Sequence, residues 1–181
     1  MTNYIALLRG INVGGHNIIK MQELRTVLTN MGLEQVRTYI QSGNVLFQSD
    51  KNASRLSELI EQEINNAFGF SVTVILRTEK EWEQLIKNCP YPVDSLLEGE
   101  SVHVACLAEQ PKQEAIDHLL QFKSDLDECY IEGKEIYFYF RQSIRDSKLA
   151  SQLPKIGVPA TVRNWKTILK LEAMLKQVIE G

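Results

Sequence analysis

The chain has 181 residues and a formal net charge of −3, and 44% of its residues are hydrophobic and 24% charged. This composition is typical of a globular protein with a buried core, and it excludes disordered, collagen-like and fibrous classes. The net negative charge argues against indiscriminate nucleic-acid binding, and no apolar run approaches the ~20 residues that a membrane helix needs.

The first half of the chain predicts the order β-α-β-β-α-β, followed by a helix. Short β-branched runs predict strands, and apolar residues repeating every three or four positions predict helices. Ser42 and Gly43 form a predicted two-residue turn, and Thr78 with Glu81 forms a predicted capping box. The predicted elements are strand 3–9, helix 21–31, strands 36–41 and 44–47, helix 56–67, strand 72–76 and a helix from residue 78.

The same order restarts after a segment that contains Pro90, Pro92 and Gly99, which we interpret as a linker. The second set consists of strand 102–107, a helix from residue 111, strands 128–132 and 135–140 around a two-residue turn, helix 143–153, strand 160–163 and a helix from residue 164. We therefore predict a first half over residues 1–89, a linker over 90–101 and a second half over 102–181.

A repeated β-α-β-β-α-β order is typical of the ferredoxin-like fold. We expect an α+β protein of two tandem ferredoxin-like halves, each an antiparallel sheet with helices on one face. A short local repeat supports an internal duplication. Arg77-Thr78 with Trp82 follows the fourth strand of one half, and Arg163-Asn164-Trp165 follows the fourth strand of the other.

The topology predicts a shared edge in the first half. In an antiparallel sheet of this order, the loop after the first strand and the turn between the second and third strands lie at the same end. That loop, residues 10–19, is long for its place and contains Gly14 and Gly15, which permit unusual backbone conformations and a close approach by a ligand.

We interpret this edge as a candidate anion site. Arg9, Gly14, Gly15 and Lys20 would hold the anion, and polar residues would add hydrogen bonds: Asn12, Gln41, Ser42 and Asn44. The glycine spacing matches neither G-x-G-x-x-G nor a Walker A motif. In an equally weighted alternative, the glycines only make turns and Arg9 pairs with a nearby acid.

Four blocks of sequence resemble a known family. They are Ala6–Gly15 (ALLRGINVGG), Met21 with Leu24-Arg25, Arg37–Val45 (RTYIQSGNV) and Ala160–Trp165 (ATVRNW). Together they resemble domain-of-unknown-function family 1697, a bacterial family of conserved proteins without an assigned function. The resemblance covers essentially the whole chain and implies the two-halved α+β fold, but it implies no reaction.

The remaining candidates are isolated residues. His16, in the glycine loop, is the one histidine we consider as an acid or base, and Arg163-Asn164-Trp165 is a second candidate binding patch. No histidine or cysteine pattern suits a metal, so we expect neither a metal nor a cofactor. The three cysteines are scattered and odd in number, and the apolar stretch 4–8 is too short for a signal peptide, so we expect a cytoplasmic protein.

Three functions remain open from the sequence. The first is binding of an anionic, phosphate-bearing small molecule at the glycine-loop edge. The second is an enzyme acting on a nucleotide-like substrate in the same pocket. The third is a protein-interaction or homo-oligomerisation module, because residues 91–140 carry a net charge of −8 and residues 141–176 a net charge of +6. Nucleic acid and membrane are not expected partners.

Overall fold

The computed structural model describes the backbone of residues 1–180 and the side chains up to Gln177. Gly181, the last residue of the predicted second half, lies outside the described residues. The chain divides into two compact units. One contains Met1–Gln84 and the described residues from Lys170 onward, and the other contains Leu85–Leu169.

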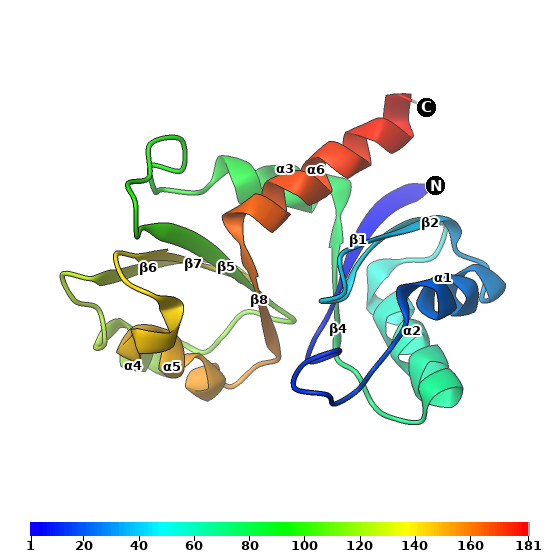
Figure 1. Cartoon of the computed structure of the whole chain (residues 1–181), viewed down its shortest axis with the longest axis horizontal. Helices are drawn as coiled ribbons and strands as arrows, with labels where there is room; N and C mark the ends of the chain where they lie inside the picture. The colour runs from blue at the N-terminus through cyan, green and yellow to red at the C-terminus, as the bar shows by residue number, and fades with distance from the viewer. Residues whose placement is uncertain (181) are drawn as a thin grey trace. The chain divides into compact units, whose positions relative to one another are not determined.

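The first unit is built on a four-stranded antiparallel sheet with the order β2-β3-β1-β4. Figure 1 labels its strands β1, β2 and β4. A capping box opens α3, as predicted, because Thr78 and Glu81 exchange hydrogen bonds of 2.9 and 3.2 Å between backbone and side chain. The elements are β1 (Thr2–Leu8), α1 (Met21–Asn30), β2 (Glu34–Tyr39), β3 (Asn44–Ser49), α2 (Ala53–Phe68), β4 (Val74–Thr78) and α3 (Glu79–Lys87).

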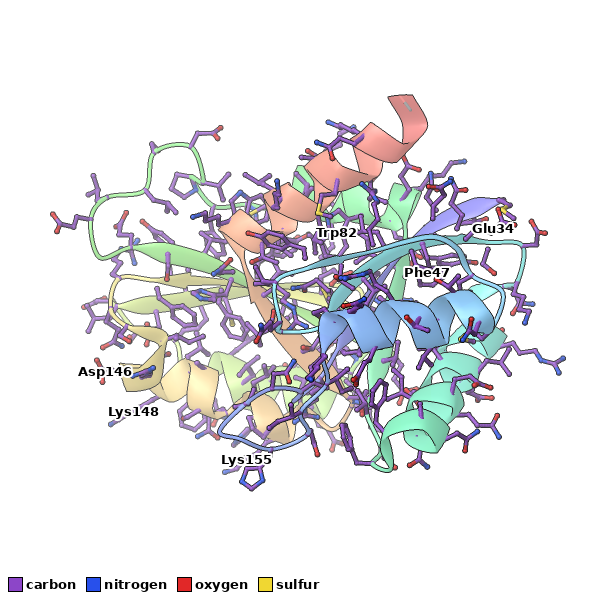
Figure 2. The ribbon with its side chains drawn as sticks, turned by 45° about the vertical axis from the view of Figure 1, so that its right-hand side comes forward. Glu34, Phe47, Trp82, Asp146, Lys148 and Lys155 are labelled. Carbon is purple, nitrogen blue, oxygen red and sulfur yellow. The ribbon has the colours of Figure 1, made fainter. Side chains whose placement is uncertain are left out.

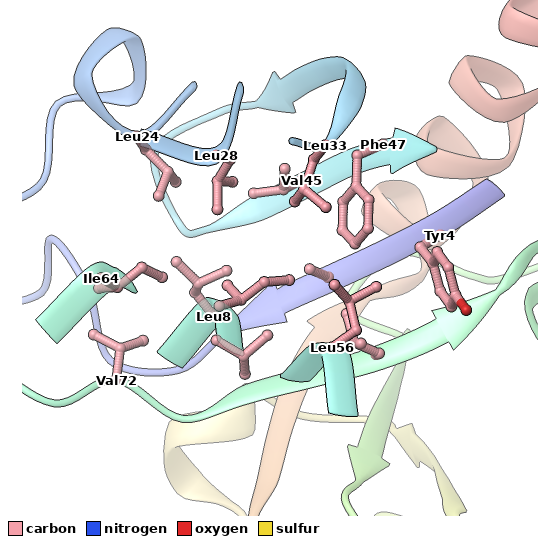
Figure 3. Packing of buried hydrophobic residues seen from close by; sticks show 14 of the residues in the cluster. Tyr4, Leu8, Leu24, Leu28, Leu33, Val45, Phe47, Leu56, Ile64 and Val72 are labelled. Atoms are coloured by element: carbon pink, nitrogen blue, oxygen red, sulfur yellow. The ribbon is translucent and has the colours of Figure 1, made fainter. Parts of the chain in front are cut away.

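The core of this unit lies between the sheet and helices α1 and α2 (Figure 3). Tyr4 pairs directly with Phe47 across β1 and β3, and their rings stack with centroids 5.4 Å apart. Leu24 and Leu28 of α1 and Leu56 of α2 close the core from the helix side. Alternate residues of a strand point to opposite faces of the sheet. This core therefore covers only one face of β1.

The opposite face of the first sheet is buried as well. Ile5 and Leu7 of β1 are fully buried, which explains the continuous apolar run in place of an alternating one. Part of this face lies under the C-terminal part of α6 (Trp165–Glu180), because Nη2 of Arg37 donates a 2.6 Å hydrogen bond to the Met174 carbonyl. Helices therefore lie on more than the one face expected from the sequence.

The second unit repeats the sheet with the order β6-β7-β5-β8. Gly133 and Lys134 form the predicted two-residue turn, since Glu132 pairs with Glu135. The elements are β5 (Ser101–Leu107), α4 (Gln113–Leu120), β6 (Asp127–Glu132), β7 (Glu135–Phe140), the 3-10 turns η1 (Ile144–Asp146) and η2 (Leu153–Ile156) around α5 (Lys148–Ser151), and β8 (Ala160–Asn164), after which α6 begins.

The expected fold class is therefore confirmed. The protein is α+β, with two similar halves that each carry a four-stranded antiparallel sheet and helices. The repeated strand order is compatible with the ferredoxin-like pattern. At this level the element order along the sequence was sufficient to predict the architecture.

The predicted helix 143–153 is wrong in detail. Three short helical pieces replace it, and Lys148 and Lys155 extend from them into solvent (Figure 2). Ser147 caps α5 through a 3.0 Å hydrogen bond from the Ala150 amide to its hydroxyl. A serine that caps a new helix interrupts the preceding one. Pro154, which has no amide hydrogen, fits the first turn of η2 and not a helix interior.

The predicted two-residue turn at Ser42-Gly43 is also too short. The connection between β2 and β3 is residues 40–43, and Ile40 already has a left-handed backbone with φ of 49°. Gly43 has φ of 93°, and its carbonyl accepts a 2.8 Å hydrogen bond from the Leu8 amide. A Cβ at Gly43 would stand 2.7 Å from the Cβ of Leu8. The close approach of the two segments therefore requires glycine.

The substitution Gly43→Ala should destabilise the protein well beyond the effect of a strained backbone alone. The left-handed conformation costs alanine about 1–2 kcal/mol, and overpacking against Leu8 should add about 1–3 kcal/mol. Gly10→Ala is the matched control, since φ there is 71° and a Cβ would meet nothing within 4 Å. Urea denaturation measures both losses. Equal losses for the two variants would show that the contact with Leu8 is unimportant.

Candidate functional site

The structure brings the glycine loop and the tip of the β2–β3 hairpin together at the side chain of Asn12. Its Nδ2 donates to the carbonyls of Gln41 and Ile19, at 2.8 and 3.0 Å. Its Oδ1 accepts a 2.9 Å hydrogen bond from the Ile19 amide. One carboxamide thus closes the loop on itself and ties it to the hairpin. The edge predicted from the topology exists.

Two cations of this edge face solvent. Arg9 follows β1 directly, and its backbone amide donates to the Thr73 carbonyl at 3.0 Å. Lys20 precedes α1 in an extended conformation and does not cap the helix with its side chain. In the described part of the chain, neither charged group makes a hydrogen bond or an ion pair. Both are therefore available to a ligand, and Arg9 has no acidic partner of the kind that the alternative interpretation required.

A hollow of about 550 Å³ opens beside Lys20, between the start of α1 and the end of α2. This volume lies within the usual range of small-molecule sites. The hollow is lined by residues from both helices: Lys20, Gln22, Glu23, Thr26, Val27, Ala67 and Phe68. No sequence pattern predicts this hollow, because residues 20–27 and 67–68 are far apart in the chain and carry no motif.

The predicted polar residues of the edge differ in their availability. Gly14, Gly15 and Gln41 are exposed. Asn12 uses its carboxamide within the edge, and Asn44 is fully buried, with Nδ2 donating to the Tyr39 carbonyl and the Ser42 hydroxyl at 3.0 and 2.9 Å. Asn12, Ser42 and Asn44 therefore hold the shape of the edge, while Gly14, Gly15 and Gln41 border solvent.

His16 lies at the exposed tip of the glycine loop. Its backbone amide donates to the Val13 carbonyl at 3.0 Å, which closes a tight turn. Among the described residues, no side chain hydrogen-bonds its imidazole ring. A catalytic histidine is usually oriented by a hydrogen bond to one ring nitrogen, and the structure shows no such partner for His16.

The second predicted patch is built into the fold. Arg163 is buried, and its Nη1 donates to the Thr161 hydroxyl at 2.8 Å and to the Val162 carbonyl at 3.0 Å. Burial lowers the pKa of its guanidinium. Asn164 caps α6 by accepting a 2.9 Å hydrogen bond from the Thr167 amide, and Trp165 is buried. Asn164 is exposed but engaged in the helix cap, so the three side chains together do not form an exposed binding patch.

The corresponding residues of the first half have the same arrangement. Arg77 is buried in β4, and its Nη1 donates to the Leu76 carbonyl at 2.8 Å. Thr78 caps the helix that follows, and Trp82 is fully buried. The local repeat that the sequence analysis recognised therefore marks how each fourth strand joins its helix.

The aromatic residues of β7 are not available for stacking on a ligand, whereas Tyr130 of β6 is exposed. All four aromatic residues of β7 are buried, and the Tyr137 hydroxyl donates to the Leu85 carbonyl. Tyr139 stacks on Tyr91 with ring centroids 5.3 Å apart. Arg141, which lies over the Tyr139 ring, forms an ion pair with Glu128 at 3.0 Å. This cluster packs the segment after α3 onto the second sheet and was not anticipated from the sequence.

Two classes of site find no support in the described residues. No group of three or more histidine, cysteine, aspartate or glutamate side chains is arranged to hold a metal ion. Among these same residues, no helix is long and apolar enough to cross a membrane.

Replacing Asn12 should loosen the edge. Asn12→Ala removes three hydrogen bonds, each worth about 0.5–1.5 kcal/mol net, so we expect a loss of roughly 2–4 kcal/mol of unfolding free energy. Asn66→Ala, on the exposed side of α2, is the control and should stay within about 0.5 kcal/mol of the parent. Urea denaturation followed by circular dichroism measures both. Similar small changes in the two variants would contradict the structural role of Asn12.

A family model and a solved structure match most of this chain, and the solved structure agrees with the fold. Residues 1–137 match the family model described as a protein of unknown function, DUF1697. The conserved bacterial protein SP0830 from Streptococcus pneumoniae is 32% identical, with a TM-score of 0.78 over 96% of this chain and 98% of that chain. An unknown protein from Galdieria sulphuraria is 12% identical over 90% of this chain and 98% of that chain, with a TM-score of 0.26.

No curated protein sequence matches the chain. The family match covers most of the chain, and the similarity to the Streptococcus pneumoniae protein extends over both halves. The glycine loop and the hairpin tip both lie within the matched residues. The chain therefore belongs to the DUF1697 family of proteins of unknown function.

Proposed function

We propose that this protein binds an anionic, phosphate-bearing small molecule at the glycine-loop edge of its first half. The observation that carries the proposal is the pair of exposed cations, Arg9 and Lys20. Neither has an internal partner among the described residues, and Lys20 borders a hollow of about 550 Å³. Two unpaired cations on one loop favour a ligand with a concentrated negative charge.

The loop between the cations suits a phosphate. Gly14 and Gly15 both have a left-handed backbone, with φ of 59° and 75°, and nothing would stand within 3.5 Å of a Cβ at either position. Glycines in such a loop allow backbone amides to approach an anion closely. Arg9 can add a two-pronged contact to phosphate oxygens, and Lys20 a point charge.

The second half provides an internal comparison. A hollow of about 360 Å³ lies at the corresponding place, between the start of α4 and the residues after η2. Its Lys112 precedes α4 without capping it, as Lys20 precedes α1. However, two carboxylates, Glu109 and Glu114, line this hollow, against the single Glu23 in the first half, so it would repel an anion more strongly. We therefore assign the anion site to the first half.

The proposal is binding and not catalysis. Among the described residues, His16 lacks an orienting partner, and a nucleotide-transforming enzyme needs a positioned acid, base or metal. No observation in the structure favours the enzyme over the binding protein.

The matched pair of lysines tests the site. Lys20→Gln should weaken binding of pyrophosphate, the probe used here, by about tenfold or more, because a charged hydrogen bond contributes about 1.5–3 kcal/mol. Lys112→Gln should leave binding unchanged, since its hollow lies in the second half. Isothermal titration calorimetry at constant ionic strength measures both. Equal weakening in the two variants would indicate nonspecific charge attraction.

Arg9→Lys separates charge from geometry. Lysine keeps the positive charge and loses the two-pronged contact, so binding of pyrophosphate should weaken. The melting temperature without ligand should not change, because the Arg9 side chain is exposed. Thermal melting with and without pyrophosphate checks both expectations. A large loss of stability, with the ligand-induced shift preserved, would assign Arg9 to the scaffold and reject its role in the site.

A further inference from the structure

Three large aliphatic side chains are exposed at this same edge. Val13 is 65% exposed, Ile18 is 63% exposed and Ile40 is 52% exposed. Val13 and Ile18 belong to the glycine loop, and Ile40 begins the hairpin tip. Single exposed aliphatic residues are ordinary, but three from segments that meet in space call for an explanation.

The hydrogen bonds of Asn12 bring the backbone segments that carry the three residues to one edge. Val13 follows Asn12 itself. Ile18 precedes Ile19, which exchanges two hydrogen bonds with the Asn12 carboxamide, and Ile40 precedes Gln41, whose carbonyl accepts the third. Each aliphatic residue is therefore next in the chain either to Asn12 or to a residue that hydrogen-bonds its side chain, so the three exposed side chains start from the same edge.

Ile40 is unfavourable for folding at its position. Its φ of 49° lies in the left-handed region, which β-branched residues rarely occupy. Asparagine or glycine would adopt this conformation with little strain. Because the Ile40 side chain is exposed, little burial of apolar surface offsets this backbone strain. Backbone strain of this kind persists where it serves a function.

The glycine loop, which contains Val13 and Ile18, is flanked by the two exposed cations. Arg9 and Lys20 stand at the two ends of the segment that contains Val13 and Ile18. A simple phosphate would use the cations and leave the aliphatic side chains in water. A ligand with an anionic group joined to a hydrocarbon part would use both kinds of side chain.

We propose that the ligand of this edge is a soluble anionic amphiphile, a phosphate ester with an aliphatic chain, whose chain packs on Val13, Ile18 and Ile40. This inference rests on the proposed function, because it assigns the phosphate to Arg9 and Lys20. Burial of the chain removes apolar surface from water on both sides of the contact. Each buried methylene should improve affinity by up to roughly fourfold.

A homologous series of alkyl phosphates tests the inference. Isothermal titration calorimetry compares inorganic phosphate, butyl phosphate and hexyl phosphate, all below the concentrations at which they form micelles, with hexanol as the uncharged control. We expect the affinity to rise from phosphate to butyl to hexyl phosphate, and hexanol to bind far more weakly than hexyl phosphate.

Ile40→Asn is the decisive variant. Asparagine suits the left-handed backbone, so the variant should fold at least as stably as the parent. It should bind inorganic phosphate with the affinity of the parent, while the increase in affinity from butyl to hexyl phosphate should become smaller. Leu97→Ser is the matched control, because Leu97 is 71% exposed and lies in the other unit. This control should leave the affinities for phosphate, butyl phosphate and hexyl phosphate unchanged.

The outcomes separate the two proposals. If phosphate binds and chain length has no effect, or if Leu97→Ser and Ile40→Asn act alike, the amphiphile is rejected and the anion site stands. If neither phosphate nor any alkyl phosphate binds, both proposals fail. Vesicles of phosphatidylcholine and phosphatidylglycerol in equal parts test the other source of this chemistry. Sedimentation with the vesicles that Ile40→Asn abolishes would overturn the soluble ligand in favour of a membrane surface.

Discussion

The Asn12 carboxamide is the interaction on which the candidate edge depends. A loop of this length with exposed glycines does not favour one conformation by itself. Fixing the backbone of each residue costs about 1–2 kcal/mol of conformational free energy. The Asn12 side chain holds two segments together, because it forms hydrogen bonds with Ile19 of the loop and with the Gln41 carbonyl of the hairpin. The close contact of Gly43 with Leu8 then holds the hairpin tip against the end of β1.

This constraint determines which side chains remain for a ligand. Asn12 and Asn44 are committed to internal hydrogen bonds, so the polar residues closest to the centre of the edge stabilise it. Arg9 and Lys20 project from its ends with no internal partner among the described residues. The internal hydrogen bonds thus use the central polar groups and leave the charged groups at the ends exposed to solvent.

The two halves use the same framework in different ways. In both, the fourth strand carries a buried arginine that bonds the carbonyl of the preceding residue, and a capping residue starts the next helix. The halves differ in the connection after their first strands. The first half has a long loop with two consecutive glycines, whereas in the second half Pro111 lies shortly before α4. Conserving the framework and varying a loop is how one fold acquires different sites.

Sequence patterns were sufficient to predict the order of the elements, the two similar halves and the edge where the glycine loop meets the hairpin. These follow from local periodicity and from the few ways in which β-α-β-β-α-β can be connected. It did not reveal that Arg163 and Trp165 are buried, or that Asn12 and Asn44 serve the fold. Whether a polar side chain faces solvent or an internal partner depends on residues far away in the chain. Those roles become visible only in the folded chain, because the hydrogen-bond partners and the hollow beside Lys20 come from segments that local sequence patterns do not relate.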